Sequence, residues 1–161
     1  MDQEPKLTPA GGPPWGLLQA RVDDKGRLKL PVAAQQTLRE NGDGGVFITS
    51  LDGITARIYP NSVWQVNREI FQQEHEDPEG AGDLHFLAES YGENTEIDSQ
   101  GRVLLPTNLR RELKLENETV WLERFKGRLT VYNNQRCEER KRRALERASA
   151  ILQMLEKKGL R

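Results

Sequence analysis

Apolar and polar residues alternate along two separate stretches of the chain, with the period of two that is typical of a β-strand. In the first stretch, Leu17 to Val22 is strand-like, and Leu28 and Leu30 resume the pattern until Pro31 ends it. Between them lies Asp23 to Arg27, an Asp-x-x-Gly-Arg sequence. Its aspartate can accept hydrogen bonds from turn amides, and its glycine tolerates a positive φ. The pattern therefore predicts two short strands joined by a sharp turn.

The same pattern returns 75 residues later, which indicates an internal duplication. The sequence Arg21-Val-Asp-Asp-Lys-Gly-Arg-Leu-Lys-Leu-Pro31 aligns with Glu96-Ile-Asp-Ser-Gln-Gly-Arg-Val-Leu-Leu-Pro106. The aspartate, the glycine, the arginine, the second leucine and the proline are identical in the two copies. We call Asp23–Arg27 the first box and Asp98–Arg102 the second box.

Each copy is predicted to continue with a short helix and a hairpin. Proline suits the first turn of a helix, and Asp-Gly between apolar runs is a strong hairpin signal. The predicted elements are a helix over 31–40, strands over 46–50, 54–59 and 95–97, a helix over 106–113, and strands over 120–125 and 128–132. Because the short strands of one copy would leave an apolar face open, we predict that the two copies close on each other as one pseudo-symmetric barrel.

The spacer between the copies predicts two helices. Asn61 or Ser62 is a suitable N-cap for a helix to about Glu74. The residues predicted to form its apolar face are Val63, Val66, Ile70 and Phe71. The segment over 76–83, rich in glycine and acidic residues, is typical of a loop, and a second short helix is predicted over 84–90.

A long helix is predicted at the C-terminal end. Asn133 or Asn134 is a suitable cap for a helix that reaches about Lys158. Its heptad-spaced apolar residues are Leu145, Ala148, Leu152 and Leu155. Two heptads are marginal for a coiled coil between subunits, so we favour packing of this face against the barrel.

Charge is distributed unevenly, although the net charge of the 161 residues is only −1. Glu69 to Asp98 contains ten acidic residues and no lysine or arginine, whereas Gln135 to Arg161 contains nine basic and four acidic residues. A basic segment of this kind binds nucleic acid or an acidic partner, or is a solvated helix face. Because consecutive basic residues on a helix point in different directions, we favour the solvated face.

Several features favour a cytoplasmic protein. Met1 to Pro14 contains four prolines, two glycines and no apolar core, so we expect a flexible leader and not a signal peptide. No apolar run approaches the ~20 residues that span a bilayer, and we expect no membrane partner. The single Cys137 cannot form an internal disulfide, which fits a reducing compartment.

Basic residues gather at the first box. Lys25 lies within it, and Arg27 and Lys29 share one strand face beyond it. An arginine on a rigid turn loses less entropy on binding, and its guanidinium holds a guanine edge or a phosphate with two hydrogen bonds. The predicted DNA contacts are therefore Arg21, Lys25, Arg27, Lys29 and Arg102, and the predicted turn-supporting residues are Asp23, Gly26, Asp98 and Gly101. An alternative is that Arg27 and Arg102 only pair with the aspartate of their own box.

Catalytic chemistry finds no support in the sequence. His75 and His85 are ten residues apart with only acidic residues nearby, a spacing that matches no metal site. There is no glycine-rich phosphate loop and no recognisable pair of nucleophile and base. We therefore expect no enzyme, no metal, no cofactor and no small-molecule substrate.

The doubled Asp-x-x-Gly-Arg-x-x-x-Pro unit resembles the SpoVT/AbrB swapped-hairpin superfamily, and its tandem arrangement resembles the MraZ family. Gly16, Asp52-Gly53 with Tyr59-Pro60, and Gly92 to Asp98 also match that pattern, so the resemblance covers roughly Trp15 to Tyr132. It implies a mainly β fold with short helices (α+β), in which two tandem SpoVT/AbrB-like units form a pseudo-symmetric barrel followed by a C-terminal helix. The implied division is a leader over 1–14, a first unit over 15–60, a helical acidic spacer over 61–94, a second unit over 95–132 and a basic C-terminal helix over 133–161.

The resemblance also implies a function. Members of the family are nucleoid-associated transcriptional regulators that bind short direct repeats upstream of the cell-division and cell-wall gene cluster, as ring-shaped homo-oligomers. The family's Asp-x-x-x-Arg DNA-binding motif corresponds to Asp23 with Arg27 and to Asp98 with Arg102. This chain differs from the family in the segment Glu69 to Asp98, which has no arginine, in Gln100 at the position of Lys25, and in its longer leader before Trp15. The alternative is an antitoxin-like module that neutralises a protein partner through its C-terminal helix.

Overall fold

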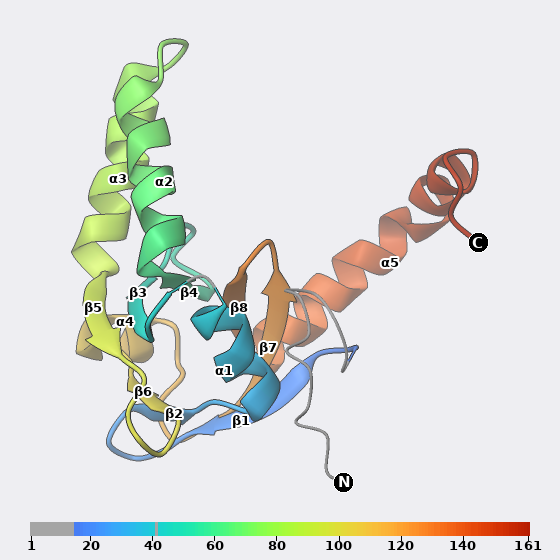
Figure 1. Cartoon of the computed structure of the whole chain (residues 1–161). Coiled ribbons are helices and arrows are strands. Elements are labelled where there is room, and N and C mark those ends of the chain that lie inside the picture. The colour runs from blue at the N-terminus through green and yellow to red at the C-terminus, as the bar shows by residue number, and fades with distance from the viewer. Residues whose placement is uncertain (1–14, 41) are drawn as a thin grey trace, which may run out of the picture.

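The computed structural model describes residues 15–40 and 42–161, and the leader predicted over 1–14 lies outside the described residues. The first copy consists of β1 (Leu18–Val22), β2 (Arg27–Lys29), α1 (Val32–Arg39), β3 (Gly45–Thr49) and β4 (Ala56–Pro60). The spacer forms α2 (Asn61–Gln73) and α3 (Pro78–Tyr91). The second copy consists of β5 (Glu93–Glu96), β6 (Arg102–Leu104), α4 (Thr107–Glu112), β7 (Thr119–Phe125) and β8 (Arg128–Asn133), and α5 (Asn134–Glu156) follows it (Figure 1).

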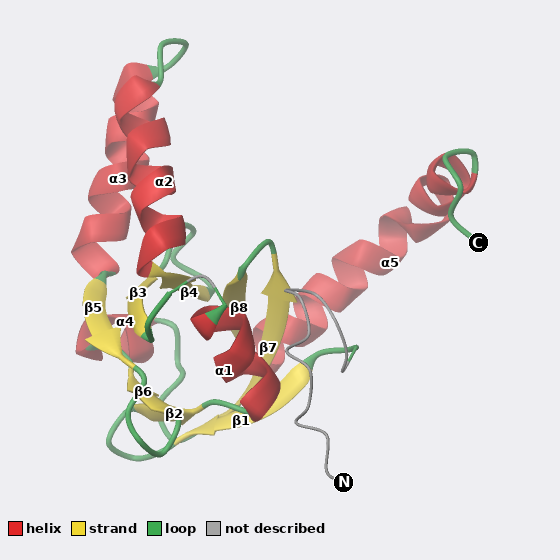
Figure 2. Ribbon diagram, viewed as in Figure 1, coloured by secondary structure: helices red, strands yellow, loops and turns green. Residues whose placement is uncertain are grey.

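All eight strands belong to one antiparallel sheet with the order β5-β3-β4-β8-β7-β1-β2-β6. The sheet curves into a nearly closed barrel, with helices at its margins (Figure 2). The two end strands, β5 and β6, are joined in sequence by the second box, so the chain itself closes the gap. The predicted fold class, mainly β with a pseudo-symmetric barrel and a C-terminal helix, is confirmed.

The two copies interleave. β1 pairs with β7, with Leu18 opposite Leu122, and its counterpart β5 pairs with β3, with Phe47 opposite Asn94. The first strand of each copy therefore extends the hairpin of the other copy. The remaining contacts between copies join equivalent strands, β2 with β6 and β4 with β8. These pairings between the copies cover the apolar strand faces that one copy alone would leave open.

The barrel interior is filled by the inward side chains of both boxes' strands and of the short helices. Leu28 of β2 and Val103 of β6 are directly opposite each other, and both are buried. Leu38 and Leu109 close the interior from α1 and α4 and are fully buried. Because each copy supplies equivalent side chains, the two copies form one shared core.

A second apolar cluster anchors the α2–α3 hairpin on the barrel. Trp64 of α2 stacks on Phe47 at 4.7 Å between ring centroids and lies 5.0 Å from Tyr59. The predicted apolar face of α2 is wrong in part, because Val66 and Ile70 are 54% and 61% exposed. Packing by the barrel and by α3 selects the side of α2 that carries Trp64, which leaves those two residues facing outward.

The N-cap of α2 and the start of α3 differ from the prediction, whereas α2 ends at Gln73, as predicted to within one residue. Pro60 occupies the N-cap of α2 without a side-chain cap, because β4 runs directly into the helix. Asn61 instead accepts a hydrogen bond from Asn94 at 3.0 Å. The loop predicted over 76–83 is helical from Pro78 onward, because Asp77 caps the first turn through the Gly80 amide at 2.9 Å.

Helix α5 begins as predicted, with Asn133 accepting the Arg136 amide at 2.8 Å. It contacts β7 and β8 near its start and then extends away from the barrel (Figure 1). The expected packing against the barrel is wrong for its distal half, where Leu145 and Leu152 are 67% and 50% exposed. Because α5 leaves β8 without an intervening loop, its direction is set before the apolar stripe begins. No helix among the described residues is long and apolar enough to cross a membrane.

Candidate nucleic-acid interface

Each box folds into the same tight turn around its aspartate. The Asp23 carboxylate accepts the backbone N–H groups of Lys25 at 3.0 Å and Arg27 at 2.9 Å. Gly26 completes this turn with a φ of +83°. In the second box the Asp98 carboxylate accepts the backbone N–H groups of Gln100 and Arg102, both at 2.9 Å, and Gly101 has a φ of +76°.

These hydrogen bonds hold the two carboxylates in their charged form. The pKa of Asp23 is lowered chiefly by the backbone N–H of Arg27, and the pKa of Asp98 chiefly by that of Arg102. Both aspartates are therefore ionised at neutral pH, and each presents its second oxygen to the arginine of its own box.

The arginines pair with these aspartates through only one of their three nitrogens. Arg27 donates Nε to Asp23 at 2.9 Å, and Arg102 donates Nε to Asp98 at 3.1 Å. Within the described residues, neither terminal guanidinium nitrogen of Arg27 or Arg102 has a hydrogen-bond partner in the protein. The aspartate thus orients the guanidinium and leaves its outer edge available for two further hydrogen bonds.

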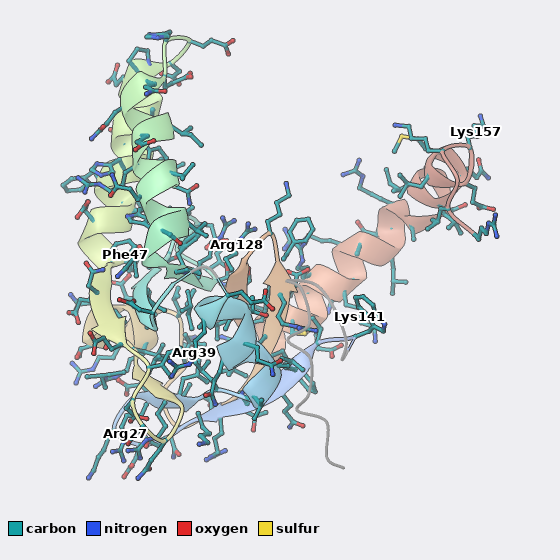
Figure 3. All side chains as sticks on the ribbon, viewed as in Figure 1. Arg27, Arg39, Phe47, Arg128, Lys141 and Lys157 are labelled. Atoms are coloured by element: carbon teal, nitrogen blue, oxygen red, sulfur yellow. The ribbon has the colours of Figure 1, made fainter. Side chains whose placement is uncertain are left out.

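The strand register brings the predicted basic residues of both boxes onto one outer face. Arg21 on β1 lies opposite Lys29 on β2, and Lys29 lies opposite Arg102 on β6. Arg27, two residues before Lys29, points from the same face at the end of the barrel (Figure 3). Lys25 is exposed in the turn itself. We call this set, Arg21, Lys25, Arg27, Lys29 and Arg102, the basic face.

Two positioning residues on this end of the barrel were missed by the sequence analysis. Gln35 of α1 donates to the Leu30 carbonyl at 2.9 Å and lies against Gly101. Arg110 of α4 donates to the Leu105 carbonyl at 2.9 Å and lies against Gly26. Each short helix therefore supports the box of the other copy. Gln35 and Arg110 are 75 residues apart, which is the offset of the duplication, so the alignment of the two copies could have indicated that they occupy equivalent positions.

The arrangement offers hydrogen-bond donors and positive charge on one surface. In the part of the chain that the structure describes, no three His, Cys, Asp or Glu residues lie close enough to hold a metal ion. The exposed Leu104 lies directly opposite Arg27 and adds an apolar contact to the basic face. Such a surface suits a polyanion with apolar groups within reach.

Comparison with known proteins gives a consistent result. A family model described as MraZ protein, antitoxin-like, matches residues 91–151. A protein of Acidobacterium capsulatum named transcriptional regulator MraZ is 40% identical over 101 residues, which cover 62% of this chain and 68% of the relative. Proteins of the same name from Koribacter versatilis and Thiobacillus denitrificans are 32% and 28% identical, over 62% and 81% of this chain and 69% and 87% of their own lengths. The chain therefore belongs to the MraZ family.

Proposed function

We propose that this protein is a sequence-specific transcriptional regulator that binds double-stranded DNA through the basic face. Regulation of transcription is the function for which its relatives are named. The protein is then a cytoplasmic, nucleoid-associated DNA-binding protein and no enzyme. Its targets are short direct repeats upstream of the cell-division and cell-wall gene cluster, and it binds them as a ring-shaped homo-oligomer.

The observation that carries this proposal is the convergence of both boxes on one surface. Arg21, Lys29 and Arg102 form a row across three neighbouring strands, with steps of about 5 Å between strands. This row lies on neighbouring strands of one sheet, so its side chains share one face and can reach a DNA groove or backbone together. The outer guanidinium edges of Arg27 and Arg102 then serve as base-edge or phosphate donors.

Repetition of the basic face in an oligomer fits repeated target sites. One face offers five basic side chains, which suffices for only a weak contact at physiological salt. When several faces are held in one assembly, the second contact forms at a high effective concentration. A regulator of this kind therefore prefers tandem sites to a single site.

The test is fluorescence anisotropy with labelled DNA from upstream of the protein's own gene, at two salt concentrations. The wild type is expected to bind this DNA more tightly than a scrambled duplex, with an affinity that falls steeply as salt rises. Arg27→Ala removes a guanidinium from the centre of the basic face, so its affinity is expected to fall at least tenfold.

Lys126→Ala is the matched control, because it also removes one exposed positive charge but lies at the opposite end of the barrel, in the β7–β8 turn (Figure 1). Its affinity is expected to stay within about twofold of the wild type. Equal loss in both variants, or a wild type that does not distinguish its upstream DNA from the scrambled duplex, contradicts the proposal.

The antitoxin-like alternative is favoured by one observation, the exposure of α5, which contains no buried residue. An exposed helix at the end of the chain is a suitable segment for neutralising a small protein partner. Stoichiometric co-purification of such a partner, and its loss on substitution of α5, would support this alternative. A homo-oligomer free of other proteins favours the regulator.

A further inference from the structure

A second positively charged surface lies between α5 and the ends of β4 and β8, away from the basic face (Figure 3). It forms a groove of about 350 Å³. Arginines from three elements converge there, and Phe125 and Ile54 add apolar walls. We call this site the arginine groove, after Arg57, Arg128, Arg136, Arg140 and Arg143.

The basic run of α5 was predicted to form no single patch, and the structure corrects this prediction in part. Arg136, Arg140 and Arg143 are spaced by four and three residues, so they share the side of α5 that lines the groove. Arg147 continues the same stripe one turn further. Arg142 does not line the groove, as expected for its position on another side of the helix.

The positive charge of the groove is poorly compensated within one chain. Arg136 pairs with Glu139 at 3.0 Å, but Arg57, Arg128, Arg140 and Arg143 form no ion pair among the described residues. The Nε of Arg128 is buried without a hydrogen-bond partner in that part of the chain. Burial and the nearby Arg57 lower the pKa of the Arg128 guanidinium, so the cluster is under electrostatic strain.

The carboxylates that line the groove relieve this strain only in part: the nearby Glu123 raises the pKa of Arg128, but burial and Arg57 lower it more. Asp52 accepts hydrogen bonds from Thr55 and from the Ile54 amide, each backbone bond at 2.8 Å. Glu123 accepts the Tyr132 hydroxyl at 3.0 Å. Both are therefore engaged with neutral groups of their own chain. The groove is accordingly a site for an anion from outside the chain.

The α2–α3 hairpin carries the opposite charge. Residues 61–91 contain seven acidic residues and one arginine. None of these carboxylates forms an ion pair with a lysine or arginine among the described residues, and Glu89 contacts only His85. On α3, Phe86 is 73% exposed, and Glu79 and Asp83 lie on the same side of the helix, seven and three residues before it. The hairpin thus presents an aromatic side chain flanked by free carboxylates.

We propose that the arginine groove of one copy binds the α2–α3 hairpin of a second copy of this chain. Phe86 packs against the apolar wall formed by Phe125 and Ile54, and Glu79 and Asp83 pair with the groove arginines. A chain does not fill its own groove, because the hairpin and α5 leave the barrel in diverging directions (Figure 1).

Such a contact is head-to-tail, because two different surfaces meet. Repeated around a rotation axis that closes, a head-to-tail contact generates a ring. This inference deepens the self-association in the proposed function and rests on that part of it, but it does not require that the protein bind DNA. Aromatic and arginine side chains are enriched among the residues that dominate binding energy at interfaces, and complementary charges set which surfaces meet.

Sedimentation velocity on full-length charge-reversal variants tests the proposal. Arg143→Glu in the groove and Asp83→Lys on the hairpin are each expected to weaken self-association at least tenfold. The chain that carries both changes is expected to regain the wild-type mass, because each altered surface again meets its complement. Arg142→Glu, one residue away on the same exposed helix, is the matched control and is expected to keep the wild-type mass.

A monomeric wild type, equal dissociation by Arg142→Glu, or failure of the double variant to reassociate while circular dichroism shows it folded, overturns the proposal. DNA binding is tested separately. Arg27→Ala is expected to leave the sedimenting mass unchanged, and Arg143→Glu is expected to retain binding to a duplex with a single repeat. The proposal that the groove binds a second copy and the proposal that the basic face binds DNA can therefore be refuted independently of each other.

Discussion

Substitution of Gly26 by alanine tests how α4 supports the first box. Gly26 has a φ of +83°, and a Cβ atom at this position would overlap the guanidinium of Arg110. Arg110 would have to move, although it donates to the Leu105 carbonyl at 2.9 Å and pairs with Glu116 at 3.2 Å. The substitution therefore combines backbone strain in the first copy with the loss of hydrogen bonds that Arg110 makes within the second copy.

The magnitude follows from these two effects. An L-residue in the left-handed region costs about 1–2 kcal/mol, and alanine recovers about 0.4–1 kcal/mol by restricting the unfolded chain. Loss of the hydrogen bond from Arg110 to Leu105 adds about 1 kcal/mol. Gly26→Ala is therefore expected to lower the free energy of unfolding by about 2 kcal/mol, a sum of these contributions. Gly53→Ala is the control, because Gly53 has a φ of +69° and a Cβ there meets only Tyr91 at 3.5 Å.

Urea unfolding at one fixed protein concentration measures both variants, together with Arg110→Ala and the double variant Gly26→Ala/Arg110→Ala. The double-mutant cycle is expected to give a coupling of about 1 kcal/mol, because the overlap disappears once Arg110 is truncated. Additive losses in the double variant, with Gly26→Ala no more destabilising than Gly53→Ala, would refute the reasoning.

Two further predictions concern the hairpin anchor and the boxes. Trp64→Ala is expected to lower the free energy of unfolding by about 3–5 kcal/mol, since Trp64 is only 6% exposed and packs on Phe47 and Tyr59; a urea midpoint within error of the wild type would contradict this. The lowered pKa values of Asp23 and Asp98 mean that their stabilising contribution is complete above the unfolded pKa of about 3.9 and is lost as the pH falls through the folded pKa. The double variant Asp23→Asn/Asp98→Asn is therefore expected to lose less stability than the wild type on acidification, and parallel pH profiles of the urea midpoint would argue against this.

The sequence by itself determined the local structure of this protein. The duplicated boxes predict their own turns, because the aspartate and the glycine that shape each turn lie within five consecutive residues. The cap of α5 at Asn133 can likewise be predicted from the sequence, since the amide that Asn133 accepts belongs to Arg136, only three residues ahead. The N-cap of α2 was predicted wrongly because β4 runs directly into this helix. The start of α3 was predicted too late because the cap at Asp77 outweighs the loop-like composition of 76–83.

The tertiary structure alone decided which surfaces exist. Besides its pairing with β2 of its own copy, β1 pairs with β7 of the other copy, and that second pairing depends on contacts about one hundred residues apart, for which the local pattern carries no signal. The pairing of β2 with β6, also between the two copies, places Arg102 beside Lys29, and Arg110 lies against Gly26, so the two boxes form one basic face. The direction in which α5 leaves β8 likewise assembles the arginine groove from residues of β4, β8 and α5. In each case the register between distant strands fixes which side chains meet, and burial of a shared core selects that register.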